Sequence, residues 1–196
     1  MKRVAAAASL CMSLLALSAC ASDGPPVTSG ATLVKSPPIA APTFGSGEED
    51  AILRAVDRFL LAVGNHDTEA LKDAQVAEGT TFAQQRTKSE AKPVQRRSNA
   101  DFAKPNPNAD YFIERYWNPT VQVRGDIAQV WAPYELRNNG QVVHCGVDAF
   151  DLVKLDGKWR VGNVMFTMEP DACGEIQPPA VSDMRPRDGW KEAPNN

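Results

Sequence analysis

The stretch Gln141–Met168, QVVHCGVDAFDLVKLDGKWRVGNVMFTM, determines the fold of this 196-residue chain. It holds two runs rich in β-branched and aromatic residues, joined by Asp156-Gly157, which has the composition of a two-residue hairpin turn. Gly125-Asp126 and Asn139-Gly140 have the same turn chemistry. The sequence therefore predicts four antiparallel strands, which run from Tyr111 to Arg124, Ile127 to Asn138, Gln141 to Leu155 and Lys158 to Met168.

These turns also predict a register, because a two-residue hairpin pairs the residues that flank it. Asn138 is expected opposite Gln141, and Leu155 opposite Lys158. Counting along the strands gives the cross-strand neighbours of three residues in the third strand. They are Glu135 and Glu169 for His144, Trp131 and Met165 for Asp148, and Gln129 and Asn163 for Phe150.

Alternation of side chains along each strand sorts the predicted sheet into two faces. One face is almost wholly apolar and carries Val121, Val123, Ala128, Val130, Ala132, Tyr134, Val143, Cys145, Val147, Ala149, Val164 and Phe166. The other mixes polar and aromatic residues. Antiparallel sheets usually have one polar face, and neither predicted face is polar throughout. One face is therefore expected to pack on helices, and the apolar face to form a homodimer.

Helices are predicted before the strands. Ser46 and Glu49 form a capping-box pattern, and apolar residues at helical spacing follow until Gly64-Asn65, which predicts the end of the helix. A second, short helix is expected after a cap at Asp67. The basic stretch from Arg86 to Lys104 is interpreted as a solvated loop with a short helix; the alternative is a positive lip that attracts an anionic ligand or lipid headgroup.

Two segments resemble the nuclear transport factor 2-like superfamily, closest to its SnoaL-like and putative lumazine-binding branches. They are Phe59-Leu60-Leu61-Ala62 running into Asn65–Leu71, and His144–Phe150 leading into Asp156–Val161. The resemblance covers about Glu48 to Glu169. It implies an α+β fold in which N-terminal helices pack on a strongly curved antiparallel sheet of about four to six strands, a cone-shaped, cystatin-like roll. The superfamily includes isomerases, dehydratases, cyclases, ligand binders and interaction modules, so the fold does not decide the function.

The N-terminus has the pattern of an export signal. Lys2 and Arg3 precede an uncharged run that ends at Leu17-Ser18-Ala19-Cys20, which resembles a bacterial lipobox. Residues 1–19 are therefore expected to be a lipoprotein signal peptide, with Cys20 lipidated and residues 20–45, rich in Pro, Ala and Ser, forming a flexible tether. Ala21-Ser22 favours the outer membrane, facing the periplasm; a plain signal peptide is the alternative.

Processing and composition limit the partners. Removal of residues 1–19 leaves 19 basic and 24 acidic residues, which argues against nucleic acid as a partner. Hydrophobic residues at 43% and charged residues at 23% exclude a mainly disordered chain. The domain is expected over residues 46–173, and the Pro-containing tail over residues 174–196 is expected to be extended or disordered.

Cys145 and Cys173 remain as a pair in an oxidising compartment, where a disulfide is expected. Two free thiols are the alternative. A catalytic or metal-binding thiol is disfavoured because only His66 and His144 could serve as histidine partners. The sequence predicts no metal and no cofactor.

The mixed sheet face is the predicted ligand pocket, because binding pockets combine apolar walls with a few polar groups. Its candidate lining residues are Gln129, Trp131, Phe150, Trp159, Asn163, Met165 and Thr167. Asp148, His144 and Glu135 are the candidate catalytic residues: a poorly solvated carboxylate at Asp148 could serve as a general acid or base. Each also has an ordinary structural interpretation, as a hydrogen-bonded or salt-linked side chain.

Three functions follow. A non-catalytic module that binds a small apolar or aromatic ligand, or an envelope partner, is favoured because no complete catalytic constellation is present. An isomerase, dehydratase or hydrolase using Asp148 with His144 or Glu135 is the alternative. The third hypothesis is a structural protein whose apolar sheet face docks onto another envelope component.

Overall fold

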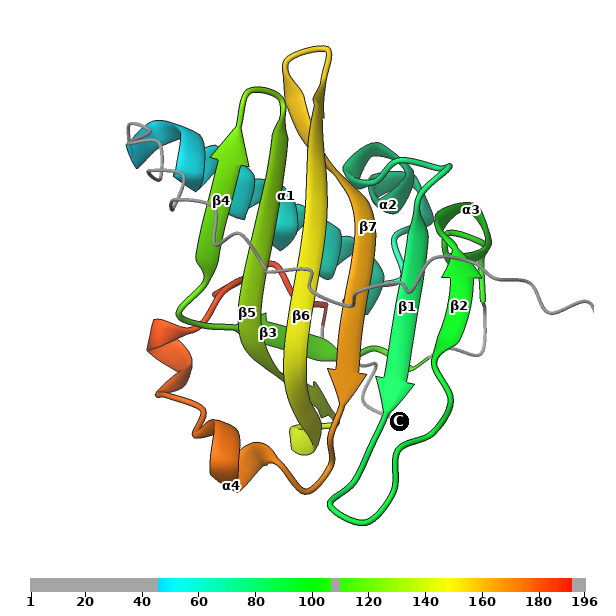
Figure 1. Cartoon of the computed structure of the whole chain (residues 1–196), viewed down its shortest axis with the longest axis vertical. Coiled ribbons are helices and arrows are strands. Elements are labelled where there is room, and N and C mark those ends of the chain that lie inside the picture. The colour runs from blue at the N-terminus through cyan, green and yellow to red at the C-terminus, as the bar shows by residue number, and fades with distance from the viewer. Residues whose placement is uncertain (1–45, 107–109, 192–196) are drawn as a thin grey trace, which may run out of the picture. The chain divides into compact units, whose positions relative to one another are not determined.

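The computed structural model describes residues 46–106 and 110–191 as an α+β domain. A long helix, α1 (Ser46–Gly64), packs across one face of a seven-stranded sheet (Figure 1). The predicted signal peptide, Cys20 and the predicted tether all lie outside the described residues. Within the described residues, no helix is long and apolar enough to cross a membrane.

The sheet is mixed and follows the order β2-β1-β7-β6-β5-β3, with β4 also paired to β5. Only β1 runs parallel to its neighbour β7; the other pairs are antiparallel. The strands are β1 (Thr80–Gln85), β2 (Gln95–Ser98), β3 (Ile113–Tyr116), β4 (Thr120–Arg124), β5 (Ile127–Asn138), β6 (Gln141–Leu155) and β7 (Lys158–Met168). The remaining elements are α2 (Thr68–Ala74), α3 (Asn99–Phe102), α4 (Cys173–Ile176) and a 3-10 turn, Val181–Asp183. The predicted α+β fold is confirmed, but the sheet is mixed and has seven strands, whereas an antiparallel sheet of about four to six strands was expected.

The N-terminal helices form where the local sequence signals place them. The apolar face of α1 is buried, with Ile52, Val56 and Leu60 almost fully excluded from solvent. The helix ends at Gly64 as predicted. Asp67 caps α2, since its side chain accepts a hydrogen bond of 3.0 Å from the Ala70 amide.

The predicted strand from Tyr111 to Arg124 is two strands. β3 pairs with the end of β5 and β4 with its start, and Trp117–Pro119 lie between them. Asn118 has a φ of 45° at this break. Proline and a left-handed residue cannot continue a ladder, so the chain changes its register against β5 here.

The register predicted from the turns is correct next to them and wrong beyond two bulges. Asn138 does pair with Gln141, but Val143 is an extra residue on β6, so Leu136, and not Glu135, lies opposite His144. Gly162 is an extra residue on β7 in the same way. Each bulge shifts the register by one residue, which exchanges the two faces of the pairing.

The bulges bring the apolar residues of both predicted faces onto one inner face against α1. That face carries buried Ala128, Val130, Ala132, Tyr134, Phe150, Leu152, Trp159, Val161 and Val164. Polar residues of the predicted mixed face, including Gln129 and Asn163, lie on the outer face instead. The predicted division into one apolar and one mixed face is therefore wrong, because burial of apolar area selects the bulged register.

This result removes the premise of the homodimer prediction, since the apolar face named for it is divided between inside and outside. The outer face still exposes Trp131 at 57% and Met165 at 47%. They flank Ala149 in one row of cross-strand pairs. The homodimer remains a prediction.

The C-terminal tail, residues 174–191, also differs from its prediction. It is ordered and partly buried: Met184 is 1% exposed. In Figure 1 it returns from α4, below the sheet, toward β3 and α1. The domain therefore extends to Lys191 rather than ending at residue 173.

We predict that Gly146→Ala destabilises the domain by about 2 kcal/mol or more, because a side-chain carbon there would overpack a close contact. It would lie 2.0 Å from the Thr167 carbonyl oxygen and 2.8 Å from the Tyr134 ring. Chemical unfolding of the purified protein measures the change. Gly174→Ala is the matched control, since nothing lies within 4 Å of its added carbon. Equal unfolding midpoints for the two variants would contradict the close contact.

Candidate functional site

The C-terminal tail is held against β3 and α1 by a backbone bridge and an ion pair. Tyr116 and Arg185 exchange two backbone hydrogen bonds of 2.7 and 2.8 Å. The Arg185 guanidinium lies 2.6 Å from Asp57 of α1. The Tyr116 hydroxyl donates to the same carboxylate at 2.8 Å. Charge-assisted hydrogen bonds of this kind are the stronger ones in proteins, so the middle of the tail is fixed to both elements.

The end of the tail is fixed at the C-terminus of α1. The Asn65 side chain donates to the Gly189 carbonyl at 2.8 Å and accepts from the Lys191 amide at 2.7 Å. The Trp190 ring lies directly on Gly64, where an added side-chain carbon would be 2.6 Å from the ring. A glycine at this position therefore allows the ring to pack on the helix backbone.

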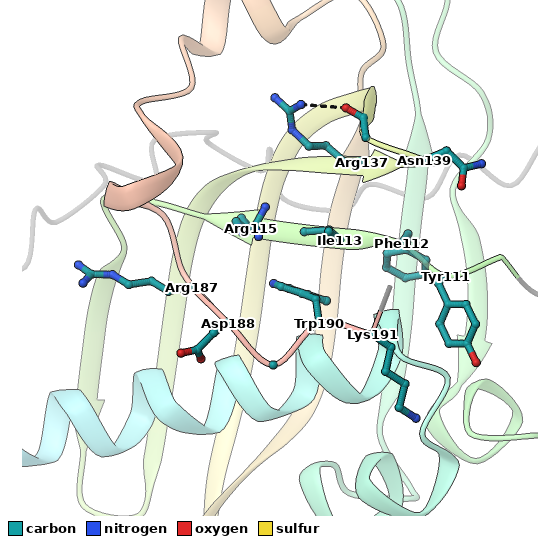
Figure 2. Close-up of a pocket in the computed structure, with 12 residues that line it drawn as sticks. Tyr111, Phe112, Ile113, Arg115, Arg137, Asn139, Arg187, Asp188, Trp190 and Lys191 are labelled. Atoms are coloured by element: carbon teal, nitrogen blue, oxygen red, sulfur yellow. Dashed lines mark hydrogen bonds between the residues drawn. The ribbon is translucent and has the colours of Figure 1, made fainter. Parts of the chain in front are cut away.

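The docked tail forms one wall of an open cavity of about 700 Å³, here called the tail cavity (Figure 2). The other walls come from the segment that enters β3, from β3 itself and from the β5–β6 hairpin. The lining residues are Tyr111, Phe112, Ile113, Arg115, Arg137, Asn139, Gly140, Arg187, Asp188, Gly189, Trp190 and Lys191. The cavity thus combines aromatic rings with an excess of basic side chains.

Arg115 is half-buried at the centre of this lining. Its Nε donates to the Pro186 carbonyl at 3.3 Å, and its guanidinium lies 6.0 Å from the centre of the Trp190 ring. Burial lowers the pKa of Arg115, and the nearby Glu135 carboxylate offsets part of this shift. Arg137 differs, because it forms an ion pair with Glu135.

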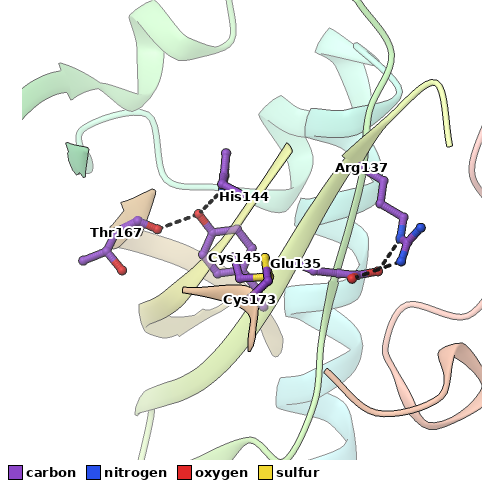
Figure 3. The surroundings of a disulfide bond; sticks show 7 residues. Glu135, Arg137, His144, Cys145, Thr167 and Cys173 are labelled. Atoms are coloured by element: carbon purple, nitrogen blue, oxygen red, sulfur yellow. Dashed lines mark hydrogen bonds and ion pairs between the residues drawn. A yellow bond between two sulfur atoms is a disulfide. The ribbon is translucent and has the colours of Figure 1, made fainter. Parts of the chain in front are cut away.

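A disulfide fixes the start of the tail. Cys145 on β6 is joined to Cys173 at the start of α4, with their Cα atoms 5.1 Å apart (Figure 3). The loop that it closes spans 28 residues, and cross-linking a loop of that length contributes about 3–4 kcal/mol on the chain-entropy estimate. The tail is therefore held at three places. The disulfide holds its start, the contacts of Arg185 with Tyr116 and Asp57 hold its middle, and the hydrogen bonds of Asn65 hold its end.

A second polar cluster lies on the inner face of the sheet. Asp148 is 2% exposed, and its side chain interacts with that of Glu114 on β3. Burial raises the pKa of Glu114 to about 7. Burial and the Glu114 carboxyl together raise the pKa of Asp148 well above its ordinary value. Two interacting carboxyls with raised pKa values can share one proton, as catalytic carboxyl pairs do.

Tyr134 and His144 lie next to this pair. The Tyr134 hydroxyl donates to the Thr167 carbonyl at 2.7 Å, and His144 Nδ1 lies 3.3 Å from the same hydroxyl (Figure 3). Burial lowers the pKa of His144, which favours the neutral imidazole. Burial and the charges of Asp148 and Glu114 raise the pKa of Tyr134. The cluster could hold or move a proton, but neither carboxyl lines the tail cavity.

The candidate catalytic residues are therefore only partly together. Asp148 and His144 both lie on β6 and face the inner side of the sheet, and Tyr134 of the neighbouring strand β5 pairs with Gly146, midway between them. Glu135 lies opposite Cys145 on the outer face and pairs with Arg137. Glu169 also lies opposite Cys145 rather than His144. The bulge at Val143 explains why Glu135 and His144 are separated. It shifts the register by one residue, so Glu135 lies on the outer face of the sheet and His144 on the inner face.

The predicted pocket residues do not form one pocket. Phe150 and Trp159 are buried in the core, whereas Trp131 and Met165 are exposed on the outer face. Three others make local bonds on that face. The Gln129 and Asn163 amides each donate to Asp151, and the Thr167 hydroxyl accepts from the Val147 amide.

Sequence reasoning missed Glu114 and the tail cavity. No role is predicted for Glu114, because the sequence indicates one long strand where the structure has β3 and β4. Arg185 and Trp190 lie in a segment whose prolines favour an extended tail, so the sequence does not indicate their contacts with the domain. Within residues 46–106 and 110–191, no group of three His, Cys, Asp or Glu side chains could hold a metal ion.

We predict that the carboxyl pair makes the domain less stable as the pH rises. Folded Glu114 keeps its proton up to a pKa of about 7, against an ordinary value of 4.5. The folded state therefore binds more protons than the unfolded state between these values, so the free energy of unfolding falls as the pH rises through this window. Glu114→Gln removes this titration. The wild type is expected to lose about 1–3 kcal/mol relative to the variant between pH 4.5 and 7.5.

Urea unfolding of both proteins across this pH range measures the difference. Glu175→Gln, which alters an exposed carboxylate on α4, is the matched control and is expected to follow the wild type. If Glu114→Gln also follows the wild type at every pH, the shared proton is disproved.

Comparison with known proteins adds a likeness of fold. No family model matches the chain, and no curated protein does. A protein of unknown function from Mycobacterium tuberculosis matches with a TM-score of 0.50 at 16% identity, covering 63% of this chain and 76% of that one.

Two further solved structures carry a fold name. A protein of unknown function with a cystatin-like fold, from Nostoc punctiforme, matches with a TM-score of 0.49 at 12% identity, over 65% of this chain and 96% of that one. A nuclear transport factor 2-like protein with a cystatin-like fold, from Novosphingobium aromaticivorans, gives 0.47 at 15%, over 67% and 90%.

Identities this low concern the arrangement of the backbone and leave activity open. The arrangement itself is a long N-terminal helix and a short second helix packed on a curled, mixed sheet whose long strands β5, β6 and β7 are consecutive hairpins. The described domain therefore has the α+β fold that the sequence predicts, and its backbone arrangement is similar to that of the Mycobacterium tuberculosis protein.

Proposed function

We propose that this protein is a lipid-anchored periplasmic module that binds a small ligand in the tail cavity without transforming it. The observation that carries the proposal is the cavity of about 700 Å³ that the docked tail encloses with β3 and the β5–β6 hairpin. Ligand sites in proteins are concave, lie in this range of volume, and combine apolar or aromatic walls with a few polar groups.

The composition of the walls supports a binding role. Phe112 and Trp190 supply flat apolar surface, and both are only partly exposed. Asn139, Arg115 and Arg187 supply hydrogen-bond donors that could orient a ligand. The anchors of the tail support it further, because a wall fixed at three points is largely preformed. A preformed site loses less conformational entropy on binding.

The location is part of the proposal and rests on the sequence. Leu17-Ser18-Ala19-Cys20 supports lipidation at Cys20, and Ala21-Ser22 supports the outer membrane. The Cys145–Cys173 disulfide agrees with an oxidising compartment. In this account the tether of residues 20–45 holds the domain near the periplasmic side of that membrane.

An acid–base enzyme is the second candidate function, favoured by the carboxyl pair of Glu114 and Asp148. A shared proton close to neutral pH suits general acid–base chemistry. Two observations favour binding over this alternative. Asp148 is 2% exposed, and the pair faces the inner side of the sheet, whereas Ile113 and Arg115 on the same strand face the tail cavity.

Native mass spectrometry of the full chain tests the proposal. The protein is purified from the membrane fraction in mild detergent, without denaturation, as wild type, Trp190→Ala and Trp131→Ala. The wild type is expected to retain a small molecule, and Trp190→Ala to lose it because the cavity loses a wall. Trp131→Ala, which changes the exposed tryptophan of the outer sheet face, is expected to retain it.

Retention by Trp190→Ala with loss by Trp131→Ala would move the site to the outer sheet face and contradict the proposal. A clean mass with nothing bound would contradict ligand binding altogether. The same spectra test the anchor: the mature chain should begin at Cys20 and carry acyl chains, and an unlipidated mature chain would disprove it.

A further inference from the structure

The basic side chains of the tail cavity are poorly neutralised. Arg115, Arg137, Arg187 and Lys191 line it, against the single acidic residue Asp188. In the part of the chain that the structure describes, only Arg137 among these four has a carboxylate within 4.0 Å. This local excess of positive charge occurs in a chain whose formal net charge is −3, so the overall composition does not account for it.

This excess of positive charge is energetically least favourable at Arg115. Its guanidinium is half-buried, yet it contacts one backbone carbonyl and the Trp190 ring, and the nearby Glu135 carboxylate is already paired with Arg137. A guanidinium carries five N–H donors, and a partly desolvated cation is stabilised most by an ionised acceptor. An anion in the cavity would supply that acceptor.

Arg187 lies on the tail wall of the same cavity and is exposed. In Figure 2 its side chain points away from Arg115 and Trp190, and because it is exposed it can turn toward a bound ligand. Two arginines favour oxyanions, because their paired N–H groups match two oxygens of a carboxylate or phosphate. The rings of Phe112 and Trp190 on the neighbouring walls favour a flat apolar body next to that anionic group.

We propose that the tail cavity binds a small organic anion, a carboxylate or phosphate ester on a flat apolar group, with Arg115 and Arg187 holding the oxyanion and Trp190 packing on the apolar part. This inference rests on the proposed function and names the chemical class of its ligand.

Isothermal titration calorimetry of the full-length protein in a nonionic detergent tests it with two probes of equal shape. Naphthalene-2-carboxylate carries the negative charge, and naphthalene-2-carboxamide is its neutral counterpart. The carboxylate is expected to bind roughly tenfold tighter or more, because charge-assisted hydrogen bonds are about twice as strong as neutral ones. Added salt should shrink this preference.

Arg115→Gln and Arg187→Gln should each reduce the preference for the carboxylate to roughly threefold or less while leaving the carboxamide affinity almost unchanged. Arg124→Gln, at an exposed arginine of β4 outside the cavity, is the matched control and should keep the full preference.

Equal affinity of the wild type for both probes would overturn the anion inference and leave the cavity as a site for neutral ligands. A preference that survives in Arg115→Gln and Arg187→Gln would overturn the assignment to these residues. Binding of neither probe at millimolar concentration would also overturn the inference, whereas the proposed function stands or falls separately with the molecule retained in native mass spectra.

Discussion

The fold depends on placing the apolar side chains of three long strands on one face of the sheet. Straight hairpins built from the turns at Asn139-Gly140 and Asp156-Gly157 would divide those side chains between both faces. The bulges at Val143 and Gly162 prevent this, since each exchanges the faces of the strand pairing beyond it. Apolar residues can then be buried against α1 on one side, while polar residues remain in water on the other.

The same constraint positions both candidate sites. Because the inner face packs against the core, the acidic groups it retains are poorly solvated: Asp148 is buried and Glu114 is half-buried, and both have raised pKa values. The outer side of β3 is left for the returning tail, which brings Arg185 to Asp57 and Trp190 to Gly64. Packing of the sheet therefore favours a site beside β3 over one on the sheet face, and gives that site a basic, aromatic lining.

The sequence correctly predicts those structural features that depend on a few neighbouring residues. The Asp67 cap, the end of α1 at Gly64 and the hairpin turns all follow from a few neighbouring residues, and the fold resemblance rests on their order. Gly162 inside a strand pattern is a known signal of a bulge, but Val143 carries none. The Glu114 partner of Asp148 depended on the break in register at Trp117–Pro119. The docking of the tail depends on partners distant in the sequence, among them Asp57 and Asn65, which lie more than a hundred residues away; composition does not show such contacts.

Hydrogen exchange at the backbone amides of Arg185 and Lys191 tests most directly whether the tail belongs to the domain. The Arg185 amide donates to the Tyr116 carbonyl at 2.8 Å, and the Lys191 amide to the Asn65 side chain at 2.7 Å. If the tail is a fixed wall of the cavity, the Arg185 amide should exchange about as slowly as central amides of β5 and β6, and Lys191 should be clearly protected. Exchange of both at the rate of an unprotected loop would contradict the account, because the cavity would then lack its wall for much of the time.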